Sequence, residues 1–235
     1  MLPDGVDLED LLNQLRPLCW GAADILMAYA RNEQPPFGFS KVLDVHDTLG
    51  GPVSAADLAV NSWLMQGLNS NFPSVDWYLL SEETAKENEV ARKSISSDWL
   101  WILDPLDGTK DFLKGSGEYA VHLALVKDHR PLLGVVLIPE LEELWFGIVG
   151  NGAWSENRIG QKNFVRFSNR KELDQMVLVC SRSHREANLE KLIQKLDLGA
   201  EKSVGSIGCK IGTILRGESD IYLSLSGKTA PKDWD

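Results

Sequence analysis

The strand and turn around Asp104 constrain this chain more than any other part of its sequence. An uncharged aromatic and aliphatic run, Trp99-Leu-Trp-Ile-Leu103, predicts a buried strand. Asp104 follows directly, and Pro105 comes next. Because proline has no backbone N–H and holds the residue before it in an extended conformation, we expect the strand to stop there. The Asp104 carboxylate would then leave the end of the sheet in a fixed direction.

A second carboxylate, that of Asp107, follows within one turn of chain. Two bare carboxylates just outside a sheet repel each other, and the pKa of one of them rises. A divalent cation removes this conflict, and oxygen ligands with no His or Cys beside them in the sequence favour Mg²⁺ over zinc. Gly108 permits a tight turn, and Thr109 opens a predicted helical turn whose free N–H groups can face an anion. A reading without metal stays open, with Asp104 as a turn residue and Asp107 as a helix cap.

The Asp-Gly-Thr triplet at residues 107–109 is also compatible with phosphatases that form an aspartyl-phosphate. Their nucleophile stands two residues before the Asp of this triplet. Here that position is Pro105, which carries no nucleophilic group. The spacing therefore argues against a covalent route.

Two further acidic residues stand at element boundaries. Ser54 and Asp57 predict the N-cap and the first turn of an amphipathic helix, and capping alone would explain Asp57. The short predicted strand 77–80 leads into Glu82, which by itself would be a solvated charge.

The remaining pattern alternates helices and strands. Residues 7–30 have helical apolar spacing, and Pro17 within them should kink the helix or separate two helices. Residues 32–51 suggest a short hairpin or a mobile loop, and Gly150 to Ala153 a tight turn. Further strands are predicted at 118–126, 131–138, 143–148, 164–167, 176–180 and 220–224. One helix is predicted at 186–196, and another begins within residues 204–210 and ends at about residue 216.

Composition narrows the class of protein. A net charge of −10 over 235 residues argues against nonspecific binding to nucleic acid polymers or to anionic membranes. The three cysteines are far apart and form no Cys-x-x-Cys pair, which favours a reducing compartment. We see neither a signal peptide nor an uncharged stretch of membrane-spanning length, so we expect a cytoplasmic protein.

The motif Asp104-Pro-Leu-Asp-Gly-Thr109, preceded by Ser81-Glu-Glu83, resembles the inositol monophosphatase superfamily of metal-dependent, lithium-sensitive phosphatases. Lys110 and the segment Ser181-Arg-Ser-His184 look more like its 3'(2'),5'-bisphosphate nucleotidase branch, the CysQ type. The resemblance extends from about residue 57 to residue 235.

This resemblance implies an α/β fold, an α-β-α-β-α sandwich with a mainly antiparallel N-terminal sheet and a smaller C-terminal α/β part. We expect an N-terminal metal-binding domain at residues 1–160 and a C-terminal substrate-side domain at residues 161–235. Members of the resembled family continue past the position of Asp235 through a helix and further strands, so we expect the C-terminal part to be incomplete.

The resemblance also implies a role for each candidate residue. Two or three Mg²⁺ ions would be held by Glu82, Asp104, the carbonyl of Leu106, Asp107 and Asp235. Catalysis would involve Glu82 and a hydrogen-bonded pair, Asp57 and Thr109, that orients the attacking water. Substrate contacts would come from Gly108, Thr109, Lys110, Ser181, His184, Ser206, Lys210 and Asp235. From the residues alone, Ser181 and His184 could equally cap the following helix.

The implied reaction is hydrolysis of a phosphomonoester by direct attack of water, without a covalent enzyme intermediate. The implied substrate is 3'-phosphoadenosine 5'-phosphate, cleaved to AMP and phosphate in sulfur metabolism. An inositol monophosphatase or a fructose-1,6-bisphosphatase-like activity remains open, because the metal motif is shared. A homodimer is compatible with the resemblance. The chain could also be a noncatalytic module that binds metal without turnover, and so not an enzyme.

Overall fold

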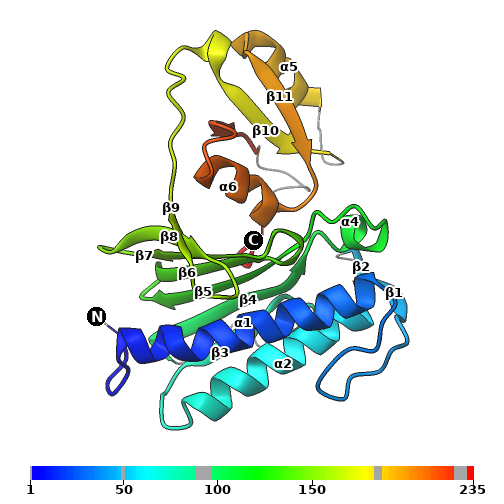
Figure 1. Ribbon diagram of the computed structural model, residues 1–235, viewed down its shortest axis with the longest axis vertical. Helices are drawn as coiled ribbons and strands as arrows, with labels where there is room; N and C mark the ends of the chain where they lie inside the picture. Colours follow the sequence, from blue (N-terminus) through cyan, green and yellow to red (C-terminus); the bar gives the residue numbers. More distant parts are fainter. Residues whose placement is uncertain (1, 49–50, 88–96, 183–186, 225–231) are drawn as a thin grey trace.

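The computed structural model describes residues 2–48, 51–87, 97–182, 187–224 and 232–235. Five layers stack along its long axis (Figure 1): the helices α1 and α2, a large sheet, helix α6, a small sheet and helix α5. This order of layers confirms the predicted α-β-α-β-α arrangement. Helix α5 spans Ala187–Leu196 and helix α6 spans Ile207–Leu215. A shorter helix, α4 (Thr109–Leu113), follows the acidic motif.

The first layer consists of two long helices, α1 (Leu8–Ala30) and α2 (Ala55–Asn71). Helix α1 is continuous, so the prediction that Pro17 separates two helices is wrong. Pro17 lies on the exposed face, where the carbonyl that loses its helical partner can bond to water instead. The apolar face predicted from the spacing is buried, with Leu11, Leu15 and Ile25 fully inaccessible.

The large sheet has seven strands in sequence order, and only its first pair is parallel. The strands are β3 (Tyr78–Ser81), β4 (Trp99–Asp107), β5 (Ala120–Lys127), β6 (Arg130–Ile138), β7 (Glu143–Ile148), β8 (Gly152–Glu156) and β9 (Lys162–Phe164). The mainly antiparallel sheet that we predicted is thus confirmed. The start of β8 was predicted as a turn, and β9 starts two residues and ends three residues earlier than expected. Because β9 pairs with β8, the large sheet extends to Phe164, and a domain boundary at residue 160 stays a proposal.

Strand β4 does not stop at Pro105, which corrects the prediction. It continues to Asp107, with a shift in register between the pairs Asp104–His122 and Asp107–Ala120. A proline is tolerated at such a bulge because the strand needs no ladder N–H there. The bulge keeps both carboxylates on a strand packed within the sheet, and both are buried.

The small sheet has three parallel strands in the order β11-β10-β12. They are β10 (Val177–Ser181), β11 (Ala200–Val204) and β12 (Ile221–Tyr222). Strand β11 was not predicted, because it is polar and largely exposed and so lacks an apolar pattern. Helix α6 contacts strands of both sheets and therefore connects the two halves of the molecule.

Short elements complete the fold. A hairpin of β1 (Val45–Thr48) and β2 (Gly51–Ser54) leads into α2, and α3 (Glu82–Glu87) follows β3. The main core lies between α1, α2 and the large sheet, and Trp101 and Phe146 are among its largest buried side chains. Among the described residues, no helix combines the length and the apolar character that a membrane crossing requires.

Candidate functional site

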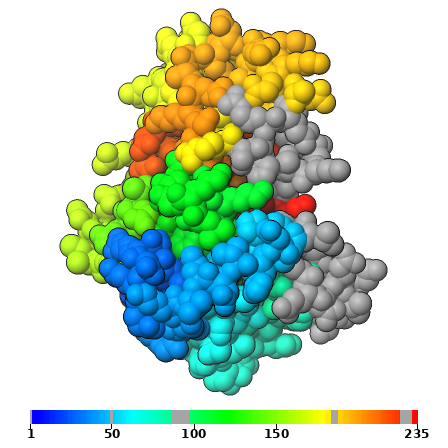
Figure 2. All heavy atoms as spheres, turned by 90° about the vertical axis from the view of Figure 1, so that its right-hand side faces the viewer, coloured from blue at the N-terminus to red at the C-terminus, as the bar shows by residue number. Residues whose placement is uncertain are grey.

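Three carboxylates converge where the two halves of the molecule meet. One oxygen each from Asp104, Asp107 and Asp235 can be chosen so that all three lie within 4.8 Å of one another. Asp104 and Asp107 are buried at the end of β4, whereas Asp235 is exposed. Figure 2 shows the C-terminal residues, in red, at the surface between the upper and lower parts of the molecule. This all-oxygen donor set fits a hard divalent cation.

The pKa of Asp104 shows the electrostatic strain of this arrangement. Burial raises that pKa well above its ordinary value, and the neighbouring charges of Glu82, Asp107 and Asp235 raise it further. A cation between these groups would remove both penalties. The structure thus brings together three of the predicted metal ligands, and Glu82 is close enough for its charge to act on Asp104.

Glu82 reaches the site because of strand order. It is the first residue of α3 and directly follows β3, which runs parallel to β4 with Ser81 opposite Leu103. The carboxyl ends of parallel neighbours meet at one edge of a sheet. Its charge acts on Asp104 and also on Asp235, raising both pKa values.

The pKa of Asp107 is shifted in the opposite direction to that of Asp104, because hydrogen-bond donors surround the Asp107 carboxylate. Burial alone would raise its pKa, but His122, Ser206 and the Gly208 N–H together hold the pKa below its ordinary value. His122 Nε2 lies 3.3 Å from Asp107 Oδ2, and the Gly208 N–H donates to the same oxygen at 2.8 Å. The Ser206 hydroxyl also donates to Oδ2.

The predicted pair of Asp57 and Thr109 is present. Thr109 Oγ1 lies 3.1 Å from Asp57 Oδ1 and 3.1 Å from the carbonyl oxygen of Leu106, with its proton available to either acceptor. Asp57 also forms the capping box of α2, accepting from Ser54 N at 2.7 Å and from Ser54 Oγ at 2.6 Å. Asp57 therefore caps α2 and pairs with Thr109 at the same time, and its role in orienting water stays a prediction. The Leu106 carbonyl keeps a second lone pair that a metal could use.

The metal-free reading of the motif agrees with part of the structure, although the helix that Asp107 contacts is α6 and not α4. Asp104 Oδ1 accepts from Leu106 N at 3.0 Å, which is a turn-like contact. Asp107 does not cap α4, whose N-cap is Gly108 in a left-handed conformation with φ 90°. It contacts the start of α6 instead. A Cβ on Gly108 would lie 3.0 Å from the carbonyl oxygen of Glu118, so glycine suits both the backbone and the space.

The predicted substrate residues differ in where they lie. Ser206 is buried as the N-cap of α6, and Lys210 is buried one turn later, with Nζ donating to the Gly205 carbonyl at 3.0 Å. Burial lowers the pKa of Lys210, against the opposing charges of Asp107, Asp111 and Asp235. Lys110 is exposed on α4, and Ser181 is half-buried at the end of β10. His184 lies outside the described residues.

His122 was not predicted from the sequence. It is buried on β5 in register with Asp104, and its neighbours from Ala120 to Val126 are apolar. A single titratable side chain within an apolar strand is the signal that could have identified it. What the sequence does not show is that β5 pairs with the strand that carries the acidic motif.

The chain is similar to a known protein family over almost its whole length. A model of the inositol monophosphatase family matches residues 7–235. The 3'(2'),5'-bisphosphate nucleotidase CysQ of Escherichia coli strain K12 is 33% identical over 214 residues, covering 90% of this chain and 79% of that protein. CysQ of Haemophilus influenzae is 29% identical over 231 residues, covering 97% and 78%.

Solved structures show the same fold. A dual-specific IMPase/NADP phosphatase bound to D-inositol-1-phosphate aligns with a TM-score of 0.74 at 21% identity, covering 97% of this chain and 78% of that one. The extragenic suppressor protein suhB from Bartonella henselae aligns with a TM-score of 0.71 at 21% identity, covering 90% and 77%. Given the family match over nearly the whole sequence and these relatives, the chain belongs to the inositol monophosphatase family of phosphatases.

Proposed function

We propose that this chain is a Mg²⁺-dependent 3'(2'),5'-bisphosphate nucleotidase that converts 3'-phosphoadenosine 5'-phosphate to AMP and phosphate. The convergence of Asp104, Asp107 and Asp235 beside the Asp57–Thr109 pair is the observation that carries the proposal. The substrate is proposed because several similar proteins are named as nucleotidases of this specificity. A cytoplasmic location is proposed because all three cysteines are free thiols.

The proposed metal ligands are the carboxylates of Glu82, Asp104, Asp107 and Asp235, with the carbonyl of Leu106. We propose two or three ions. When bound, magnesium would lower the pKa of water and offset the charge of the transferring phosphate. The hydrogen bonds from Ser206 and Gly208 keep one oxygen of Asp107 occupied, so its other oxygen is the one available to a metal.

Thr109 and Asp57 would position the attacking water. If Thr109 donates its proton to Asp57, its hydroxyl lone pairs can accept a hydrogen bond from water. Burial raises the pKa of Asp57, although the Ser54 and Thr109 hydrogen bonds oppose this. A raised pKa makes Asp57 a better acceptor for a proton that passes through Thr109.

The substrate phosphate would lie near the start of α4, with Gly108 and Thr109 steadying its oxygens. Lys110, Ser181, His184, Ser206 and Lys210 remain proposed substrate contacts. Among them, Lys210 is the buried cation beside Asp107, and its Nζ lies 5.5 Å from the centre of the Tyr222 ring. Lys210 therefore carries a positive charge near Tyr222 of the small sheet, and the charges of Asp107 and Asp235 act on it.

The test is phosphate release with Mg²⁺ from 3'-phosphoadenosine 5'-phosphate, inositol 1-phosphate and fructose 1,6-bisphosphate. The proposal expects the bisphosphorylated nucleotide to have the largest kcat/KM, and Asp107→Asn to reduce turnover by about 100-fold or more. Faster turnover of inositol phosphate would replace the substrate assignment with the inositol monophosphatase alternative. Mg²⁺ binding without release from any substrate would favour the noncatalytic module.

A further inference from the structure

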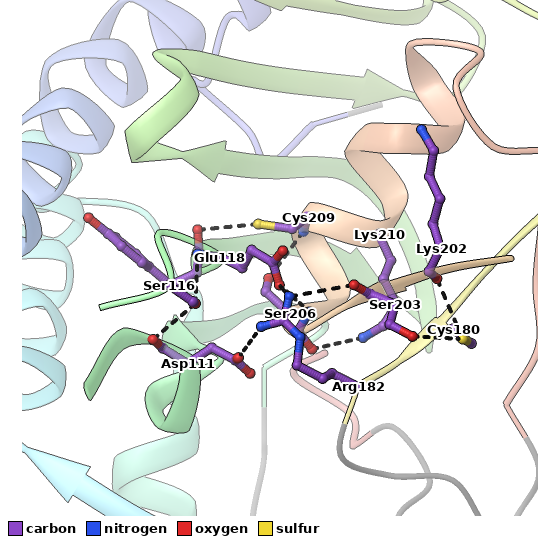
Figure 3. A network of polar contacts seen from close by, with 12 residues as sticks. Asp111, Ser116, Glu118, Cys180, Arg182, Lys202, Ser203, Ser206, Cys209 and Lys210 are labelled. Atoms are coloured by element: carbon purple, nitrogen blue, oxygen red, sulfur yellow. Dashed lines mark hydrogen bonds and ion pairs between the residues drawn. The ribbon is translucent and has the colours of Figure 1, made fainter. Parts of the chain in front are cut away.

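A polar network joins the two halves of the molecule beside the acidic cluster (Figure 3). Arg182, directly after β10, reaches two carboxylates of the large-sheet half. Its NH1 donates to Asp111 Oδ1 on α4 at 2.9 Å, and its NH2 donates to Glu118 Oε2 at 2.6 Å. The guanidinium therefore spans two carboxylates. With both contacts made, its charge is already compensated, which makes it a poor phosphate ligand in this conformation.

Glu118 holds a second partner with the same oxygen. The N–H of Gly205 donates to Glu118 Oε2 at 2.7 Å. Gly205 immediately precedes Ser206, the N-cap of α6. Glu118 thus fixes the backbone at the point where the chain turns from the small sheet into the helix that contacts Asp107.

The turn at Gly205 packs closely against its neighbours. A Cβ placed on Gly205 would lie 2.3 Å from Asp111 Oδ2, the carboxylate that also binds Arg182. On the other side, a Cβ on Gly108 would lie 3.2 Å from Ser206 Cβ. The turn lies between Asp111 of α4 and Gly108 of the motif, and these contacts help to set its position.

One residue further along, the same segment reaches Asp107. The Ser206 hydroxyl and the Gly208 N–H both donate to Asp107 Oδ2. The contacts form a continuous path from Arg182 through Glu118, Gly205 and Ser206 to Asp107. Each step in it is a hydrogen bond, an ion pair or a peptide bond.

We propose that Glu118 and Arg182 are positioning residues that set the affinity of the acidic site for its divalent cation. They hold the Gly205–Ser206 turn so that its donors orient the Asp107 carboxylate, and Arg182 acts in this way rather than as a substrate ligand. This inference rests on the proposed function. Partners that orient a metal ligand typically change metal affinity about 10-fold to 100-fold when they are removed.

The variants separate the two contacts of Glu118. Glu118→Ala removes both the Arg182 ion pair and the acceptor for Gly205 N–H. Glu118→Gln keeps an oxygen acceptor for Gly205 and loses the charge. Arg182→Ala removes the ion pairs to Asp111 and Glu118, together with a 3.5 Å hydrogen bond to the Ser203 carbonyl, and keeps the Glu118 acceptor for Gly205. The matched control is Glu143→Gln, since Glu143 on β7 pairs with Arg216 at 2.6 Å, at the opposite end of α6. It also joins α6 to the large sheet but lies outside the path to Asp107.

Two measurements are made on every full-length variant. The first is Mg²⁺ binding by titration calorimetry without substrate, with thermal unfolding as a check of stability. The second is steady-state phosphate release from 3'-phosphoadenosine 5'-phosphate. We expect Glu118→Ala to weaken Mg²⁺ binding by about 10-fold or more, Glu118→Gln and Arg182→Ala to weaken it less, and Glu143→Gln to leave it unchanged.

Two results would overturn the inference. One is unchanged Mg²⁺ affinity in Glu118→Ala. The other is an Arg182→Ala variant whose KM rises about 10-fold while its Mg²⁺ affinity stays that of wild type, because this pattern identifies a substrate ligand. A wild-type protein that binds Mg²⁺ but releases no phosphate would contradict the proposed function alone, and the calorimetry would still decide this inference.

Discussion

At the scale of single residues, Asp57 uses its two carboxylate oxygens for different purposes. Oδ2 accepts from the backbone and the hydroxyl of Ser54 and so stabilises the start of α2. Oδ1 accepts from the Thr109 hydroxyl at the edge of the acidic cluster. Substituting the partners one at a time therefore separates helix stability from the proposed chemistry.

Ser54→Ala removes the N-cap side chain of α2 and should lower the free energy of unfolding, measured by urea denaturation, by about 1 kcal/mol.

Thr109→Val keeps the side-chain shape but removes the hydroxyl. It should lower kcat, measured by phosphate release, by about 100-fold or more with little change in stability. Near-normal kcat in Thr109→Val would show that the hydroxyl has no catalytic role.

At the scale of secondary-structure elements, helix α6 joins the small sheet to the acidic cluster. Its first turn packs against β5, and a Cβ on Gly208 would lie 2.4 Å from His122 Nε2 and 2.6 Å from the Ala120 Cβ. The helix can come this close to the strand only because residue 208 is a glycine. That approach is what brings the Gly208 N–H to Asp107.

Gly208→Ala should force α6 away from β5 and lower the free energy of unfolding by about 1–3 kcal/mol. Its Mg²⁺ affinity should fall as well, since the donor to Asp107 moves. Gly134→Ala on β6 is the control, because nothing lies within 4 Å of a Cβ there. Equal stability of the two variants in urea denaturation would contradict the close packing described for α6.

The start of β12 depends on one carboxylate. Asp220 accepts from Arg170 Nε at 2.7 Å, from the Val177 N–H at 2.7 Å and from the Ser168 hydroxyl. Burial alone would raise its pKa, but these three donors outweigh burial and hold the pKa below its ordinary value of 3.8. The folded state therefore gains stability from ionised Asp220 above that value and loses it as pH falls through the lower folded-state pKa.

Asp220→Asn should lower the free energy of unfolding by about 1–3 kcal/mol at neutral pH, because it weakens charge-assisted hydrogen bonds. The difference from wild type should stay constant down to about pH 5 and shrink as the pH drops below about 4. Denaturation curves of both proteins at several pH values measure it. If the difference in the free energy of unfolding between wild type and Asp220→Asn grew on acidification, the lowered pKa of Asp220 would be wrong.

At the scale of the whole molecule, the site exists because two sheets meet. Strands β3 and β4 of the large sheet bring Glu82, Asp104 and Asp107 to one edge, and α6 from the other half supplies the donors that orient Asp107. Asp235 comes from the end of the chain, where Trp234 packs against Leu80. The residues proposed to hold a cation therefore come from three separate parts of the chain.

This arrangement explains what could be predicted. Asp104 and Glu82 were proposed as metal ligands from the Asp-Pro-Leu-Asp-Gly-Thr motif and the family resemblance, and these roles stay proposals. Ser54 was predicted because N-caps have a local signature. The continuous β4 was missed because a bulge depends on the partner strand. His122 was missed because its importance comes from β5 lying beside the motif. The donors on Asp107 are about a hundred residues away in sequence, and only the packed structure brings them together.

The central claim is that these separate carboxylates share a divalent cation, and anomalous diffraction from crystals soaked in Mn²⁺ tests it most directly. The account predicts an anomalous peak at roughly 2.1–2.3 Å from oxygens of Asp104, Asp107 and Asp235. The same soak of Asp107→Asn serves as the control and should show a weaker peak or none. Well-ordered crystals of the wild-type protein with no peak among these residues would contradict the account.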